Sequence, residues 1–117
     1  MLLAFSVAPS GQPAHLAGDP AAPASGASAD ASVHDAVAAA VKIVRDSGLP
    51  NHTDSMFTTI EGEWDEVFAV VKQATEAVGR FGSRVSLVIK ADIRPGYSGE
   101  LTGKVERLEN AITNVPG

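Results

Sequence analysis

The sequence predicts an α+β protein, a ferredoxin-like βαββαβ sandwich with an additional C-terminal helix. Short apolar and β-branched runs alternate with longer segments whose apolar residues recur at helical spacing. The chain has 117 residues, which suits a single domain over residues 1–117. Its 44% hydrophobic and 20% charged residues suffice for a packed core. We expect a four-stranded antiparallel sheet with two helices on one face.

The first strand is expected over Leu2–Val7, a short apolar run that Pro9 follows. Alanine, proline and glycine then dominate from Ala8 to Ala31, and four prolines in this stretch oppose both helix and sheet. We therefore predict a flexible insertion at about residues 10–31. Long connections without secondary structure are uncommon in small domains, and whether this one acts as a lid is left open.

The first helix is expected over Val33–Ser47. Ser32 would cap it, with Asp35 three residues on in a variant of the capping box. Gly48 and Pro50 would end it. Its apolar stripe would consist of Val33, Val37, Val41 and Val44.

A hairpin is expected next, with strands in Asn51–Phe57 and Thr58–Glu63 and a bend near Met56 and Phe57. The bend carries no strong turn signal, which leaves the register open. A second helix follows, because the acidic residues at its start favour the positive end of a helix dipole. Gly79 and Gly82 would end this helix. Its buried stripe would comprise Trp64, Val67, Phe68, Val71, Thr75 and Val78.

The fourth strand, Val85–Ile89, is apolar on nearly both faces and is predicted to be central in the sheet. The last helix is expected to pack through a stripe of Leu101, Val105, Leu108 and Ile112. Apolar residues on both faces of the first and fourth strands would leave one sheet face exposed in a monomer. We therefore expect a sheet-to-sheet dimer or a larger oligomer.

Composition excludes several classes of function. The chain carries 14 acidic and 9 basic residues, a net charge of −5, which disfavours nucleic acid as a partner. It has no cysteine, so disulfides, thiolate metal sites and thiol nucleophiles are excluded. No basic residue precedes the first apolar run, and no apolar window approaches the ~20 residues of a membrane span. We expect a cytoplasmic protein without membrane contact.

Other motifs carry little chemistry. The three histidines, His15, His34 and His52, lack the spacing of a helical metal site, so no metal is expected. The glycine-containing segment 79–84 runs from a helix to a strand, whereas phosphate-binding loops run from a strand to a helix. Tyr97-Ser98-Gly99 lacks the leading glycine and the setting of a nucleophile elbow.

Hydroxyl, carboxylate and aromatic side chains gather between Met56 and Glu66. Glu61 precedes a glycine, so its carboxylate could enter a cleft and accept hydrogen bonds from an amidine or aminopyrimidine. Phe57 or Trp64 could stack on such a ring. In the alternative interpretation, Thr58 and Thr59 are ordinary strand residues, the acids only favour the helix dipole, and Trp64 belongs to the core.

Several segments together resemble the YkoF-like family of small thiamine-binding proteins with a ferredoxin fold. The resemblance covers nearly everything outside residues 10–31, where this chain carries its insertion. The matching segments are Ala4-Phe5-Ser6-Val7 before Pro9, Ser32-Val33, Ala40-Val41-Lys42, Ser47-Gly48-Leu49, Met56, Thr58-Thr59-Ile60-Glu61-Gly62-Glu63, Asp65-Glu66-Val67, Arg84-Val85, Ile89-Lys90 and Lys104-Val105-Glu106.

The resemblance implies a non-enzymatic protein that binds thiamine or its hydroxymethylpyrimidine moiety and assembles into dimers or tetramers by sheet packing. No cofactor is implied. The residues that match the family motif and are expected in the pocket are Ser6, Ser32, Thr58, Thr59 and Glu61. Phe57 and Trp64 are added on chemical grounds as stacking residues.

Two other classes of function are weighed against ligand binding. A small enzyme could use Glu61 as a general base, but this needs a second acid, base or metal, and no motif supplies one. A structural or regulatory module could instead bind another protein through its oligomer. Thiamine titration distinguishes the interaction module from a thiamine-binding protein, because a ligand of the folded state raises the melting temperature. Turnover of thiamine or its pyrimidine would indicate the enzyme.

Overall fold

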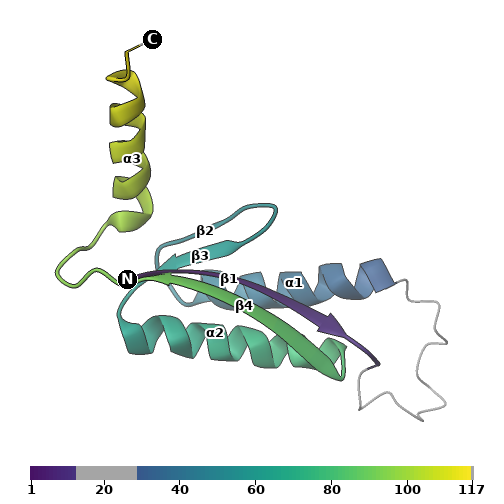
Figure 1. The fold of residues 1–117 in the computed structure, drawn as a ribbon. Coiled ribbons are helices and arrows are strands. Elements are labelled where there is room, and N and C mark those ends of the chain that lie inside the picture. Colours follow the sequence, from purple (N-terminus) through teal and green to yellow (C-terminus); the bar gives the residue numbers. More distant parts are fainter. Residues whose placement is uncertain (13–28, 117) are drawn as a thin grey trace.

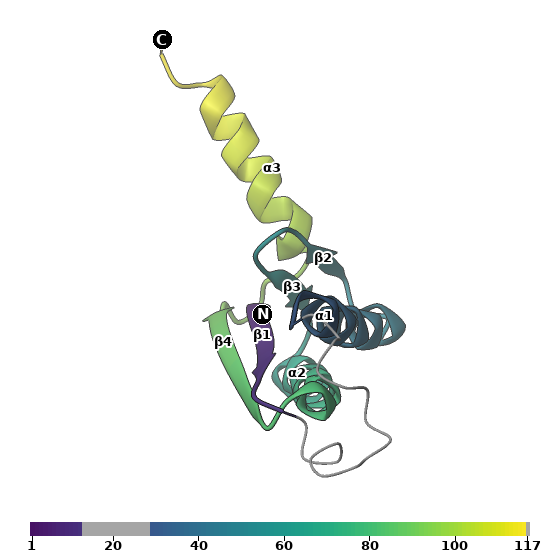
Figure 2. The same cartoon turned by 90° about the vertical axis from the view of Figure 1, so that its right-hand side faces the viewer.

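Four strands form one antiparallel sheet in the order β2-β3-β1-β4. The computed structural model describes residues 1–12 and 29–116. Helices α1 and α2 lie on one face of this sheet, and the opposite face is open (Figures 1 and 2). The predicted α+β architecture with a four-stranded antiparallel sheet is confirmed. Its elements are β1 (Leu2–Ser10), α1 (Ala29–Asp46), β2 (Asn51–Thr53), β3 (Thr58–Glu61), α2 (Trp64–Val78), the short 3₁₀ helix η1 (Gly79–Phe81), β4 (Arg84–Asp92) and α3 (Glu100–Thr113).

The core lies between the sheet and the two helices. In β1 alternate residues are buried, because successive side chains of a strand point to opposite faces. Ile60 of β3 lies opposite Leu3 of β1 and is equally buried. The buried apolar cluster comprises Leu3, Phe5, Val7, Ala36, Ala40, Val44, Ile60, Val67, Val70, Val71, Ala74 and Val78.

The segment between the first strand and the first helix is shorter than predicted at both ends. β1 continues through Pro9 to Ser10, paired with β4, so the proline does not end the strand. Only β4 pairs with β1 beyond Phe5, and a strand with one free side can accommodate a residue without an N–H. The segment that connects β1 and α1 therefore covers residues 11–28 rather than the predicted 10–31. Residues 13–28 of it lie outside the described part of the structure.

The start of α1 is also corrected. The helix begins at Ala29, so Ser32 lies inside it and is not its N-cap. The small side chains of Ala36 and Ala40, with Val44, form the face that packs on the core. Val33 and Val37 of the predicted stripe lie beside this face and remain partly exposed. Small residues on the packed face allow the helix backbone to approach the sheet closely.

The second helix is confirmed, and its box of reciprocal hydrogen bonds is formed by Glu63 and Glu66. Trp64 is 52% exposed, so its assignment to the buried stripe was wrong. Trp64 is the first residue of the helix and packs on Phe68, with ring centroids 4.9 Å apart and ring planes inclined at 38°. After the helix, Gly82 approaches β1 so closely that a Cβ there would lie 2.5 Å from the Ser10 carbonyl oxygen.

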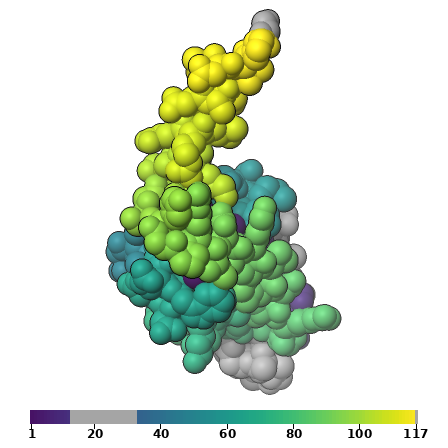
Figure 3. Space-filling view, turned by 60° about the vertical axis from the view of Figure 1, so that its left-hand side comes forward, coloured from purple at the N-terminus to yellow at the C-terminus, as the bar shows by residue number. Residues whose placement is uncertain are grey.

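Two predictions about the C-terminal part are wrong. β4 is an edge strand rather than a central one, and most of its side chains are exposed. The helix α3 forms, but it projects away from the sheet (Figure 3). Its apolar residues Val105, Leu108 and Ile112 are each more than half exposed. A helical period therefore predicted the helix correctly without predicting a surface for it to pack on.

Candidate functional site

The β2–β3 turn is built around the Asp54 carboxylate. Its Oδ1 atom accepts hydrogen bonds from the backbone N–H groups of Met56 (2.8 Å) and Phe57 (2.9 Å), and the Asp54 N–H donates to the Phe57 carbonyl (2.9 Å). An aspartate that accepts from the next backbone amides is a common way to close a tight turn. The predicted hairpin is thus confirmed, but its strands are shorter than expected. β2 ends at Thr53 rather than Phe57, β3 ends at Glu61 rather than Glu63, and the turn comprises residues 54–57.

These hydrogen bonds also set the ionisation of Asp54. Those from Phe57 first and Met56 second stabilise the carboxylate, so the pKa of Asp54 lies below its ordinary value of 3.8. Asp54 is exposed and therefore charged throughout the neutral pH range. A carboxylate that two backbone amides orient therefore lies at this turn.

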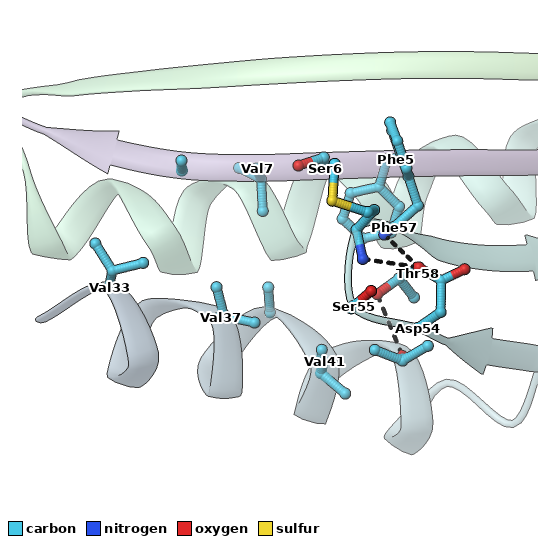
Figure 4. Close-up of a pocket in the computed structure, with 14 residues that line it drawn as sticks. Phe5, Ser6, Val7, Val33, Val37, Val41, Asp54, Ser55, Phe57 and Thr58 are labelled. Atoms are coloured by element: carbon cyan, nitrogen blue, oxygen red, sulfur yellow. Dashed lines mark hydrogen bonds between the residues drawn. The ribbon is translucent and has the colours of Figure 1, made fainter. Parts of the chain in front are cut away.

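A cavity of about 250 Å³ lies between this turn, β1 and α1 (Figure 4). Its apolar wall includes Phe5, Val33, Val37 and Val41, so the outer valines of α1 that do not reach the core border this cavity. Ser6, Thr53, Asp54, Ser55 and Thr58 supply polar groups. A mostly apolar cavity with a few polar groups is typical of a small-molecule site.

The ends of two strands leave hydrogen-bonding groups beside this cavity. β3 pairs with β1 only as far as Phe5, so the β3 side of Ser6 and Val7 has no strand partner. The Thr53 and Thr58 hydroxyls lie 3.2 Å apart and hydrogen-bond to each other, with Thr58 buried. Backbone and hydroxyl groups therefore converge at the point where the sheet narrows.

The structure brings together three of the residues predicted for the site. Ser6, Phe57 and Thr58 line the cavity, with Phe57 in the turn beside Asp54 (Figure 4). Ser32 belongs to the first turn of α1, and its side chain lies outside the described part of the structure. Thr59, Glu61 and Trp64 do not line this cavity.

Glu61 has a different set of partners. Its Oε2 accepts a hydrogen bond from the Glu100 backbone N–H at 2.8 Å, and its Oε1 accepts one from the Leu101 N–H at 3.3 Å. Glu61 is 8% exposed and provides from β3 the cap that Gly99, which precedes α3, cannot supply from a side chain. Its carboxylate therefore holds the first turn of α3 against the end of the sheet.

Salt bridges support the same helix. Lys104 contacts Asp92 at 2.6 Å, and Arg107 contacts Glu100 at 2.6 Å. The Lys104 ammonium lowers the pKa of Asp92, and the Arg107 guanidinium lowers the pKa of Glu100. The base of α3 is thus attached by polar contacts, while its apolar stripe remains uncovered.

A second hollow, about 920 Å³ and open to solvent, lies between α3 and the sheet. Thr59 lines it together with Leu2, His52 and apolar residues of α3. Trp64 lies past the far end of β3, after Glu61 and Gly62. The predicted cluster between Met56 and Glu66 is therefore divided, because alternate strand residues point to opposite faces.

Thr53, Asp54 and Ser55 are polar cavity residues that the sequence analysis did not assign to the site, and Asp54 carries the only charge among them. The signal that could have identified Asp54 is the pair Asp54-Ser55 between the segments predicted as strands, since aspartate and serine favour turns. Within residues 1–12 and 29–116, no group of three or more potential metal ligands is found. None of the helices in that part of the chain has the length and apolar character needed to cross a bilayer.

The fold and the cavity together define a class: small α+β proteins with one helix-covered sheet and a cavity beside the first strand. The chain belongs to the Thiamine-binding protein family, whose profile matches residues 22–109. It is 53% identical over 81 residues to a UPF0045 protein of Mycobacterium bovis, covering 68% of this chain and 79% of that protein. A UPF0045 protein of Synechocystis is 36% identical over 84 residues, covering 71% and 69%.

Solved structures share the same fold. A domain of unknown function, DUF77, from Bacillus cereus superposes with a TM-score of 0.67 at 28% identity, covering 91% of this chain and 86% of that one. A provisionally assigned thiamine biosynthesis/salvage protein of Thermotoga maritima superposes with a TM-score of 0.66 at 20% identity, covering 92% and 96%. The resemblance identified from sequence motifs is confirmed at the level of the family.

Proposed function

We propose that this protein is a cytoplasmic binding protein for thiamine or its hydroxymethylpyrimidine moiety and that it does not transform its ligand. The observation that carries the proposal is the Asp54 carboxylate, oriented by two backbone amides at an apolar cavity that Phe57 also lines. Membership of the Thiamine-binding protein family supports the same class of ligand.

The chemistry of the ligand matches these groups. Thiamine carries a cationic thiazolium and an aminopyrimidine, and a carboxylate can attract the cation or accept hydrogen bonds from the amino group. The Phe57 ring can stack on a planar heterocycle. The 250 Å³ cavity is close to the lower end, roughly 300 Å³, of ordinary ligand pockets, so the pyrimidine moiety fits it better than a larger ligand does.

Asp54→Asn is expected to weaken binding of thiamine about tenfold, because a hydrogen bond to a charged group contributes more than a neutral one. The Asn Oδ1 atom can still accept the two backbone hydrogen bonds, so the turn is retained while the charge is lost. Isothermal titration calorimetry with thiamine and with hydroxymethylpyrimidine measures this effect. Asp65→Asn, an exposed carboxylate outside the cavity, is the matched control.

Equal affinities of wild type and Asp54→Asn would contradict the proposed role of Asp54. Glu61 remains the acid that family resemblance predicts for the ligand, and Glu61→Gln in the same titrations tests that assignment. Absence of binding and of any thermal shift at millimolar thiamine would favour the alternative of a protein-interaction module. Turnover of either ligand by the purified protein would instead indicate an enzyme.

We also propose that the chain acts as a homo-oligomer, with sheet packing covering apolar surface. Val88 on the open sheet face is 53% exposed, and the stripe of α3 is uncovered. Burying this apolar surface between the chains of an oligomer would remove it from water, which is energetically favourable. Sedimentation equilibrium is expected to give a mass of at least twice 12.0 kDa, and a 12.0 kDa species at micromolar concentration would contradict the proposal.

A further inference from the structure

Met56 is an exposed thioether at the cavity beside β1 and α1. The residue lines this cavity and is nevertheless 72% exposed, so its side chain lies between the cavity and solvent. Its backbone N–H donates to Asp54 Oδ1 at 2.8 Å, which holds the backbone of the turn in place. A methionine side chain is unbranched and flexible. Met56 therefore combines a fixed backbone with a mobile apolar side chain that solvent can reach.

The other sulfur of the chain is less accessible. The sequence contains two methionines and no cysteine, so Met1 and Met56 hold all of its sulfur. Met1 is partly buried and packs against the core, and its amino group donates to the Gly62 carbonyl at 2.8 Å. A thiol would compete for an oxidant, and this chain has none. An oxidant in solution therefore meets the Met56 sulfur first.

The reaction expected at this sulfur is oxygen-atom transfer from a peroxide. The Met56 sulfur attacks one oxygen of hydrogen peroxide, an S–O bond forms and the O–O bond breaks. The departing oxygen takes up the proton of the transferred oxygen and leaves as water. The sulfur is oxidised to a sulfoxide while the peroxide is reduced, and methionine sulfoxide reductases can return the sulfoxide to the thioether.

Oxidation would change what Met56 contributes to the cavity. As a thioether it adds apolar surface to a cavity whose wall includes Phe5, Val37 and Val41. A sulfoxide oxygen is polar, and burying it without a hydrogen-bond partner is unfavourable. The oxidised side chain is therefore expected to turn toward water and to withdraw its apolar surface from a ligand in the cavity.

We propose that Met56 is an oxidation site through which peroxides lower the affinity of the cavity for its ligand. The position of the site follows from the exposure of Met56 and the sulfur content of the chain, and it does not depend on the ligand. The effect on affinity rests on the proposed function of the cavity in binding thiamine or its pyrimidine moiety.

Limited treatment with hydrogen peroxide, followed by peptide mapping in a mass spectrometer, locates the oxidation. One added oxygen atom is expected on Met56 in most molecules while most of Met1 is still unmodified. In Met56→Leu, which retains an apolar side chain without sulfur, the rapid uptake of oxygen is expected to disappear. Oxidation of Met1 as fast as Met56 would overturn the assignment of the site.

Calorimetric titration with thiamine, before treatment and after removal of the peroxide, measures the effect on affinity. Oxidation of the wild type is expected to raise the dissociation constant about fivefold, because apolar contact with the ligand is lost. A methionine sulfoxide reductase with a dithiol is expected to restore the affinity. The affinity of Met56→Leu is expected to be the same before and after treatment. Met56→Gln, with an unbranched polar side chain, is expected to weaken binding as the sulfoxide does.

The outcomes distinguish this proposal from the proposed function. Selective oxidation of Met56 without a change in affinity would overturn the effect on the cavity and leave thiamine binding intact. A loss of affinity that the reductase does not reverse, or that also occurs in Met56→Leu, would overturn it as well. An untreated wild type that binds neither ligand would overturn the proposed function and the effect on affinity, and peptide mapping would still decide the oxidation site. Circular dichroism verifies that the oxidised protein remains folded.

Discussion

Glu61→Ala is expected to release the first turn of α3 from the sheet. The substitution removes the acceptor of two backbone hydrogen bonds, from Glu100 and Leu101, at a site where Glu61 is buried. Loss of a cap typically costs about 0.5–2 kcal/mol, and hydrogen bonds to a charged group about 1.5–3 kcal/mol. Hydrogen exchange of the α3 amides is therefore expected to accelerate about tenfold or more.

The controls separate capping from general destabilisation. Glu61→Gln keeps one acceptor oxygen, so the exchange rate of its α3 amides is expected to lie between those of Glu61→Ala and the wild type. Glu106→Ala removes an exposed acid of α3 without touching its first turn and should leave exchange nearly unchanged. If α3 amides exchange at the wild-type rate in Glu61→Ala, Glu61 does not anchor this helix.

Phe5→Ala is expected to lower the free energy of unfolding by about 3–5 kcal/mol, because it removes a large buried ring and leaves a void. Phe5 is 2% exposed, belongs to the core cluster and also borders the proposed ligand cavity. Urea denaturation followed by circular dichroism measures this loss. A ligand titration of the folded variant would show whether the enlarged cavity still holds the pyrimidine.

Phe5→Leu provides the matched control, since leucine fills much of the same space and is expected to cost about 1.5 kcal/mol or less. A small effect of both substitutions would mean that Phe5 contributes little to packing. A large effect of both would indicate that the shape of the ring, rather than its apolar volume, is required. If the variants and the wild type unfold with the same dependence on urea concentration, the difference between their unfolding midpoints reports the change in stability alone.

Much of the fold was predictable because the relevant patterns are local. The stripe of Val67, Val71 and Val78 predicted α2, and the acids before it predicted its start. The apolar run of β1 predicted the strand whose alternate residues build the core. The boundaries of the elements were less predictable. Pro9 stays within β1 because β1 pairs only with β4 at that point, so the other side of the strand needs no N–H donor. The helix α1 begins before Ser32.

The candidate site was predictable only in part. Ser6, Phe57 and Thr58 meet at the cavity, as expected of residues from the first strand and the hairpin. Glu61 and Thr59 follow Thr58 closely in sequence, yet they lie elsewhere because β3 turns alternate side chains to opposite faces and ends beside α3. Asp54 borders the cavity because the hairpin turn lies beside α1.

By itself the sequence determined the class of fold, the family and the region from which the site is built, because periodicity, turn chemistry and motif order are properties of neighbouring residues. Only the tertiary structure decided which acid borders the cavity, which strand lies at the edge and which apolar stripe remains exposed. Those outcomes depend on contacts between segments far apart in the chain, such as Glu61 with Glu100, and no local pattern encodes them.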